Sequence, residues 1–196
     1  MKTTLHRRDV VEALLKDRKG LLVVAGLGST AWDITAAGDT SLNFPLWGGM
    51  GNAAMMGLGL ALAQPGRRVL VITGDGEMLM GLGSLATIGV QKPRNLAVVV
   101  IDNERYGETG MQRTHTSAGV DLAAVAKACG FRATRQVRSR AQLGALRSAA
   151  LSLPGPVFAQ VKVIAEKLPL VLPPRDGSLL KSRFRKTLLG EAADLD

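Results

Sequence analysis

Residues 69–76 read Val-Leu-Val-Ile-Thr-Gly-Asp-Gly, an apolar run that ends at a glycine-rich acidic turn. Residues 96–103 read Leu-Ala-Val-Val-Val-Ile-Asp-Asn and repeat the pattern with a different polar ending. Apolar runs of this length are typical of strands that are buried on both faces of a parallel sheet. Because the carboxyl ends of such strands meet at one edge, we expect Asp75 and Asn103 to lie close together there.

The rest of the chain alternates between strand-like and helix-like segments. Strands are expected at 21–25, 69–73, 96–101, 131–137 and 157–163, and helices at 51–63, 78–90, 121–129 and 140–151. This alternation predicts an α/β fold of three layers, α/β/α, with a central and mostly parallel sheet. We expect residues 1–167 to form one domain. Residues 168–196 are expected to form a C-terminal extension that packs on a partner through its basic, amphipathic stretch 178–189.

Length and composition set the broad class of protein. At 196 residues the chain is long enough for one domain with a sizeable core. A single cysteine, Cys129, excludes a disulfide framework and a cysteine-ligated cluster within the chain. Residues 1–9 are charged and lack the apolar stretch of a signal peptide, and no later stretch has the length of a membrane span. We therefore expect a cytoplasmic protein that has no membrane interaction.

The formal net charge of +9 raises the question of nucleic-acid binding. The basic residues concentrate in two clusters, which are Arg132, Arg135, Arg138, Arg140 and Arg147, then Lys181, Arg183, Arg185 and Lys186. Neither cluster is interleaved with stacking aromatic residues. We therefore expect no nucleic-acid partner. A solvated face, an acidic partner subunit or attraction of an anionic substrate would account for the charge.

The polar endings of the two apolar runs suggest a chemistry. A carboxylate oxygen from Asp75 and an amide oxygen from Asn103 are hard ligands that suit Mg²⁺. The flanking glycines let the backbone approach a phosphate closely, and a helix that follows would direct the amides of Gly76 and Glu77 at it. The sequence therefore predicts a metal-bridged diphosphate; the alternative is a structural turn with an asparagine cap.

Gly74-Asp75-Gly76, followed after 25 residues by Asp102-Asn103, resembles the thiamine diphosphate motif. The second part of that motif is a pair of asparagines, and the first asparagine of the pair is replaced by Asp102 here. The chain is similar, over about residues 20–165, to the diphosphate-binding domain of the 2-oxoacid decarboxylase and acetolactate synthase group. Within this group it most resembles the small subunit of sulfopyruvate decarboxylases and the C-terminal part of phosphonopyruvate decarboxylases.

The resemblance implies a set of cofactor contacts. Asp75, Asn103 and the main-chain carbonyl of Arg105 would hold Mg²⁺. Met50, flanked by glycines, would wedge between the two rings of thiamine diphosphate, and the Gly48 carbonyl would accept a hydrogen bond from its amino group. A glycine-rich helix entry with a core methionine is the alternative for this segment. The expected cofactor-binding residues are Ser29, Gly48, Met50, Gly74, Asp75, Gly76, Glu77, Asn103, Arg105 and Tyr106.

The polar stretch 106–116 follows the proposed metal ligands directly and, by the same resemblance, would form part of the active-site wall. Glu108 and Thr109 are the candidates for managing protons. His115 would contact an anionic substrate or relay a proton, with a plain surface histidine as the alternative. Together with Met50, these three residues are the expected catalytic set.

The family activates its cofactor through a glutamate of a different domain, for which this chain has no room. We therefore expect a large, pyrimidine-binding partner subunit that supplies this glutamate, in a hetero-oligomer with at least two copies of each chain. The predicted function is a thiamine diphosphate-dependent decarboxylase subunit that acts on a small anionic 2-oxoacid such as sulfopyruvate or phosphonopyruvate.

Three alternatives remain open from the sequence. A 2-oxoacid:ferredoxin oxidoreductase β subunit carries the same cofactor motif, although its assembly needs an iron–sulfur cluster that Cys129 alone cannot hold. A non-catalytic, regulatory subunit would bind the cofactor without turnover. Residues 26–31 have the G-x-G-x-x-A form of an NAD-binding turn, but residues 46–51 lack the acid that this fingerprint requires.

Overall fold

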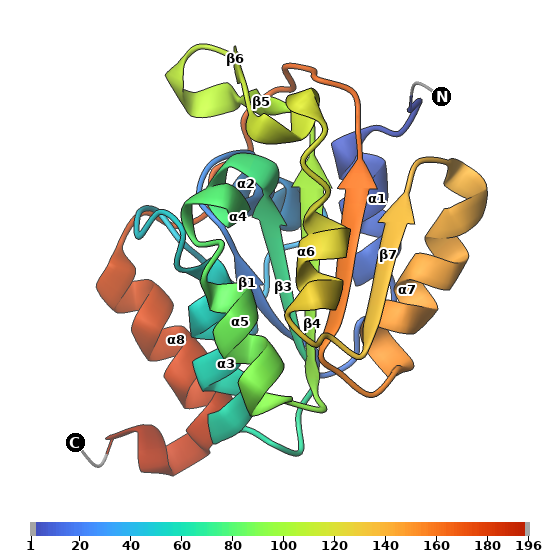
Figure 1. Ribbon diagram of the computed structural model, residues 1–196. Coiled ribbons are helices and arrows are strands. Elements are labelled where there is room, and N and C mark those ends of the chain that lie inside the picture. The colour runs from blue at the N-terminus through green and yellow to red at the C-terminus, as the bar shows by residue number, and fades with distance from the viewer. Residues whose placement is uncertain (1–2, 195–196) are drawn as a thin grey trace.

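The computed structural model describes residues 3–194 and contains one central sheet of six parallel strands (Figure 1). The strand order is β2-β1-β3-β4-β8-β7. The strands are β1 Leu22–Ala25, β2 Asn43–Pro45, β3 Val69–Gly74, β4 Leu96–Asp102, β7 Ala133–Val137 and β8 Val157–Lys162. In β4, alternate residues face opposite sides: Val98 belongs to one hydrophobic cluster and Val99 to the other. Both faces of the sheet are therefore buried, as the apolar runs predict.

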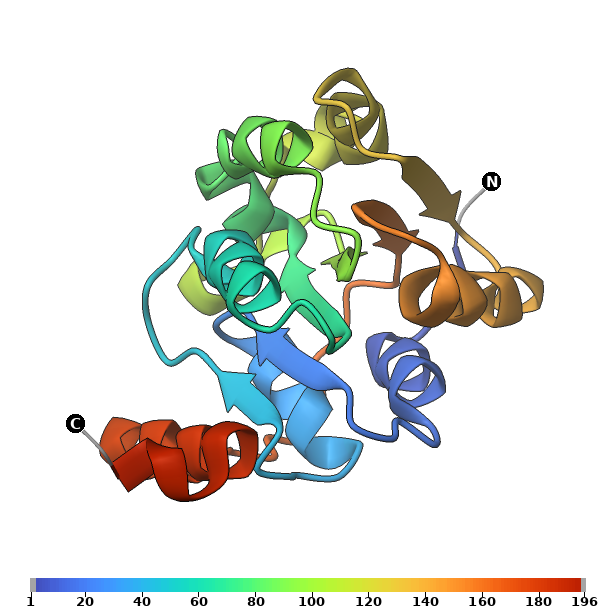
Figure 2. The same ribbon diagram turned by 90° about the horizontal axis from the view of Figure 1, so that it is seen from below.

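Helices cover both faces of this sheet, as the view along the strands shows (Figure 2). One face carries α1 Arg7–Leu15, α2 Ser29–Ala36 and α7 Leu143–Ser152, and the other carries α3 Ala53–Ala63, α4 Asp75–Met80, α5 Ser84–Gln91 and α6 Leu122–Ala128. The prediction of a three-layer α/β/α fold with a parallel sheet is confirmed. Among the residues that the structure describes, no helix is long and apolar enough to cross a membrane.

The expected single helix over 78–90 is wrong. The structure has two helices there, α4 and α5, and α4 already begins at Asp75. The break lies at Gly81, where a Cβ atom would come within 2.0 Å of the carbonyl oxygen of Gly51. The chain turns at this point because the loop before α3 packs directly against the backbone at the end of α4.

The stretch that the sequence leaves irregular, 104–119, forms a small hairpin above the sheet (Figure 1). Its strands are β5 Arg105–Tyr106 and β6 Gln112–Arg113, with short 3₁₀ helices at Gly107–Thr109 and His115–Ala118. The hairpin therefore stands directly over the carboxyl edge where the polar ends of β3 and β4 meet.

The C-terminal helix α8 Gly177–Leu189 lies beside β2, at one edge of the sheet (Figures 1 and 2). Its buried residues are Leu180 and Phe184, and the Phe184 ring packs edge-on against Phe44 of β2 with centroids 5.3 Å apart. Arg183 makes hydrogen bonds of 2.6 and 3.0 Å to the carboxylate of Asp39. One side of the extension thus packs on its own domain.

Candidate active site

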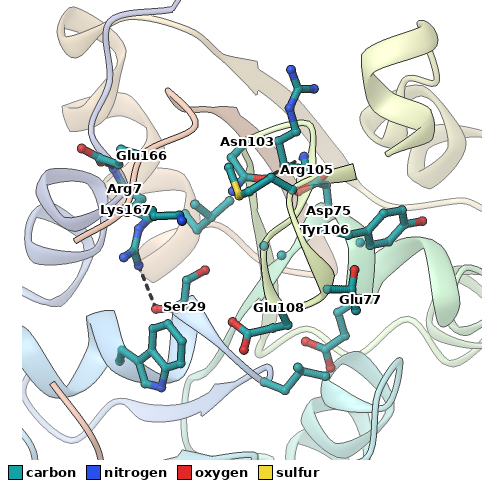
Figure 3. Close-up of a pocket in the computed structure, with 18 of the residues that line it drawn as sticks. Arg7, Ser29, Asp75, Glu77, Asn103, Arg105, Tyr106, Glu108, Glu166 and Lys167 are labelled. Carbon is teal, nitrogen blue, oxygen red and sulfur yellow. Dashed lines mark hydrogen bonds between the residues drawn. The ribbon is translucent and has the colours of Figure 1, made fainter. Parts of the chain in front are cut away.

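A cavity of about 410 Å³ opens at the carboxyl edge of the sheet. Its walls come from the loop after β1, the loop before α3, the turns after β3 and β4, and the segment after β8 (Figure 3). The predicted residues that line it are Ser29, Met50, Gly74, Asp75, Gly76, Glu77, Asn103, Arg105, Tyr106, Glu108 and Thr109. The fold therefore brings together most of the residues that the sequence analysis selected from segments far apart in the chain.

Asp75 is the first residue of α4 and is only 2% exposed. Its Oδ2 accepts hydrogen bonds from the hydroxyl of Thr114 at 2.5 Å and from that of Thr116 at 3.2 Å. Burial, and then the nearby charge of Asp102, raise the pKa of Asp75 to about 7. The Asp75 carboxylate has no cationic partner: among the described residues, no side-chain nitrogen of Lys, Arg or His lies within 4.0 Å of its oxygens.

Asp102, which stands where the family motif has its first asparagine, is fully buried and has its own counter-charge. Its Oδ1 accepts a hydrogen bond from Thr116 at 2.8 Å, and its Oδ2 lies 2.8 Å from Nζ of Lys162. Burial opposes the charged form of Lys162, but hydrogen bonds to Asp102 and Glu104 raise its pKa overall. The aspartate that replaces the first asparagine of the motif thus forms a buried ion pair with Lys162. Because Lys162 compensates its charge, the site does not carry a second unpaired negative charge beside Asp75.

Asn103 follows β4 and forms a tight turn in which its Oδ1 accepts a hydrogen bond from the backbone amide of Arg105 at 2.9 Å. The ring of Tyr106 packs on Gly76, where a Cβ atom would come within 2.7 Å of it. Gly76 therefore allows the β5 strand to approach the start of α4, and Asp75 and Asn103 both line the cavity.

The loop after β1 contributes the start of α2. Gly28 has a positive φ of 74° before Ser29, the first helical residue. Arg7 of α1 donates a hydrogen bond to the Ser29 carbonyl at 3.1 Å (Figure 3). The Arg7 guanidinium also lies 2.5 Å from the buried carboxylate of Asp33. Arg7 thus stabilises the first turn of α2 through the Ser29 carbonyl, and it also lines the cavity.

Two of the predicted residues do not line the cavity. Gly48 lies on the exposed loop before α3, whereas its neighbour Met50, 61% exposed, does reach the cavity. His115 is exposed, while Thr114 and Thr116 on either side of it are buried against Asp75. Glu108 lies between Ser29 and Glu77 in the close-up, on the cavity wall (Figure 3).

The sequence analysis missed the side chains that support the site. No local pattern marks Thr114, Thr116, Lys162 and Arg7, since the carboxylates they contact lie 14 to 60 residues away in the chain. A weak signal existed for Lys162, because a lysine in the mostly apolar run 157–163, whose other polar residue is Gln160, suggests a buried carboxylate partner.

The donor set fits a magnesium-bound diphosphate. Among residues 3–194 no three His, Cys, Asp or Glu side chains gather as a metal cluster. A cation at Asp75 would instead rely on one carboxylate, the Asn103 amide oxygen and a main-chain carbonyl, with phosphate oxygens completing the shell. The buried carboxylate without a cationic partner is the observation that favours such an ion.

A family model described as the C-terminal TPP-binding domain of thiamine pyrophosphate enzymes matches residues 27–161. The chain therefore belongs to the enzymes that use thiamine diphosphate, also called thiamine pyrophosphate or TPP.

Individual relatives narrow the class. The chain is 36% identical over 190 residues to sulfopyruvate decarboxylase subunit beta of Methanothermobacter thermautotrophicus, covering 97% of this chain and 99% of that one. It is 43% identical over 141 residues to phosphonopyruvate decarboxylase of Streptomyces viridochromogenes, covering 72% of this chain but 35% of that protein. The predicted family and the prediction of a thiamine diphosphate-dependent decarboxylase are confirmed.

The solved structure of benzoylformate decarboxylase from Polynucleobacter necessarius matches with a TM-score of 0.69. The match covers 85% of this chain and 34% of that one at 23% identity, so it supports the fold alone.

Proposed function

We propose that this chain is the diphosphate- and Mg²⁺-binding subunit of a decarboxylase that acts on sulfopyruvate, phosphonopyruvate or a closely similar anionic 2-oxoacid. Its likeness to a sulfopyruvate decarboxylase β subunit extends over nearly the whole of both chains, which supports a subunit of this type. The single observation that carries the proposal is the buried Asp75 carboxylate beside Asn103, in a cavity at the carboxyl edge of a parallel sheet.

Several groups of this chain would serve the cofactor. Asp75, Asn103 and the carbonyl of Arg105 would hold Mg²⁺, while backbone amides at the starts of α2 and α4 would bind the diphosphate. When bound, thiamine diphosphate supplies the electron sink that decarboxylation of a 2-oxoacid requires. Lys167, an exposed residue of the cavity wall, would give positive charge for an anionic substrate, and Glu108 would hold or release a proton at this wall.

The need for a partner is supported by helix α3. Its sequence from Ala53 to Ala63 contains no polar residue, and such a helix is normally covered on all sides. Here one side is open, because Met55, Met56 and Leu62 are each more than a third exposed. This open side follows directly on the loop that carries Met50. A pyrimidine-binding subunit that covers it would close the cavity and bring the activating glutamate.

Thermal unfolding of the chain together with its pyrimidine-binding partner tests the proposal. We expect thiamine diphosphate plus Mg²⁺ to raise the melting temperature by roughly 5–10 °C at a hundredfold excess over Kd, and neither ligand alone to do so. Asp75→Ala should abolish the ligand-dependent rise, and Asp9→Ala, on the exposed side of α1, should leave it intact. The active assembly should then release CO₂ from sulfopyruvate or phosphonopyruvate without an electron acceptor, unlike a ferredoxin oxidoreductase. An unchanged ligand response in Asp75→Ala would contradict the assignment.

A further inference from the structure

Glu77 is a second buried carboxylate at the site, and the proposed metal set does not use it. It lies in the first turn of α4, is 7% exposed, and has no Lys, Arg or His of the described residues within 4.0 Å. Its Oε2 accepts a hydrogen bond from the hydroxyl of Thr73 at 2.6 Å, and its Oε1 accepts one from the Ala53 amide at 3.3 Å. Burial raises the pKa of Glu77, and the backbone amides of Leu27 and Gly51, together with the Thr73 hydroxyl and the Ala53 amide, oppose that rise.

These donors come from three separate parts of the chain. Thr73 is the next-to-last residue of β3, Leu27 follows β1, Gly51 precedes α3, and Ala53 begins it. The carboxylate also fills the space beside Gly26, where a Cβ atom would lie 1.6 Å from Oε2. Glu77 therefore connects the loop after β1 and the loop before α3 to the carboxyl end of β3.

Few other contacts fix the loop before α3: inside it, the Asn52 amide donates a hydrogen bond of 3.0 Å to the Gly49 carbonyl and closes a turn around Met50. Gly49 and Gly51 both have positive φ values, 67° and 83°, so Met50 sits between two conformationally free residues. No heavy atom approaches the position of a Cβ on Gly48 within 4 Å. The loop is held at its far end, where the Gly51 carbonyl packs against Gly81 and Glu77 faces the Gly51 amide.

We propose that Glu77 is a positioning residue whose carboxylate holds the loop 48–52, and with it Met50, toward the cavity. The holding of the loop follows from this chain alone, and only the step from Met50 to the cofactor rests on the proposed function. A carboxylate suits the task because three of the four groups around its oxygens are backbone amides, which can only donate, and the single acceptor oxygen of an amide side chain would satisfy fewer of them.

Hydrogen exchange of the full-length chain, read peptide by peptide, tests the holding of the loop. We expect Glu77→Gln to speed exchange in the segment 49–53 by about tenfold, while β3 and β4 exchange as in the wild type. Glu12→Gln, an exposed glutamate on α1, is the matched control and should change neither. Equal exchange of the segment 49–53 in wild type and Glu77→Gln would overturn the proposal.

Two further variants approach the carboxylate from its partners and keep the test decisive if Glu77→Gln does not fold. Thr73→Val removes one donor and should speed exchange in the same segment to a smaller extent. Gly26→Ala places a methyl group where Oε2 lies and should reproduce the effect of Glu77→Gln. If both variants fold and leave the segment 49–53 protected, Glu77 does not hold the loop.

A double-mutant cycle in the assembled enzyme tests the action through Met50. A displaced loop should lower kcat by about a hundredfold in Glu77→Gln with little change in KM, as should Met50→Ala. The double variant should be no slower than Met50→Ala, because Glu77 acts through that residue. Additive losses would overturn this step. Failure of cofactor binding in the wild type would instead contradict the proposed function, with the exchange result still standing.

Discussion

At the scale of single residues, the chemistry of the site depends on how a buried carboxylate is kept charged. Burial and the neighbouring Asp102 raise the pKa of Asp75 to about 7, well above its ordinary value of 3.8. The folded chain therefore binds a proton at Asp75 between about pH 4 and pH 7, where the unfolded chain has lost it. In the absence of a divalent cation, this residue makes the folded state less stable as pH rises through that window.

The first prediction concerns this pH dependence. Without divalent cations, the free energy of unfolding of the wild type should fall between pH 4 and pH 7 by up to roughly 4 kcal/mol from Asp75. Asp75→Asn should remove this part of the slope. Glu77, Asp33 and His6, whose pKa values are also raised, contribute slopes of the same sign, so the difference between the two proteins is the quantity to measure. Urea unfolding across the pH range would show it, and parallel curves would contradict the pKa assignment.

The sequence predicts the residues at the centre of this site better than those that support them. Asp75 and Asn103 come directly after the strands β3 and β4, so chain position alone places them at one edge of the sheet. Thr114 lies 39 residues from Asp75, on a hairpin whose path depends on where Tyr106 packs on Gly76. Supporting contacts of this kind arise from the folded arrangement of loops, which hydrophobic periodicity does not encode.

At the scale of secondary structure, burial decides what the sequence reveals. Strands β3 and β4 are buried on both faces, and their apolar runs predict them from the sequence. Helix α1 escaped prediction because its stretch Arg7–Leu15 begins with two arginines, and the structure buries the first of them against Asp33. The three-residue strand β2 is too short for any period to show. The prediction of one helix in place of α4 and α5 is wrong because the break depends on the contact of Gly81 with Gly51. These glycines lie in separate segments, and no sequence pattern indicates that they meet.

The second prediction concerns α8, whose attachment to the domain depends on few apolar side chains. Phe184→Ala removes a buried ring that packs on Phe44, and it should lower the free energy of unfolding by about 3 kcal/mol. Limited proteolysis should then cut the connection 164–176 more rapidly than in the wild type. Leu179→Ala on the exposed side of the same helix should change stability by less than about 0.5 kcal/mol. Equal proteolysis of the Phe184 variant and the wild type would show that α8 is held by other contacts. Packing of the opposite side of residues 168–196 on a partner stays a prediction.

At the scale of the whole molecule, the chain presents an active-site cavity and an open apolar surface side by side. Met50 and Met80 line the cavity and are both more than half exposed, and Met55, Met56 and Leu62 extend this surface along α3. Side chains of this kind are costly to leave in water, at roughly 25 cal/mol per Å² of apolar area. This arrangement supports the proposal that the partner which would cover α3 also completes the active site.

The third prediction follows from this continuity. Met55→Glu should weaken association with the pyrimidine-binding subunit at least about tenfold, because a charge would be buried against an apolar surface. Leu153→Glu, directly after α7 on the other face of the sheet, introduces the same charge at a residue of nearly equal exposure and should leave assembly unchanged. Sedimentation of each variant with the partner would measure association, and calorimetry would measure binding of thiamine diphosphate to the same samples. Both should decline together in Met55→Glu. Lost assembly with retained cofactor affinity would mean that this chain binds the cofactor by itself, and that the α3 surface serves assembly alone.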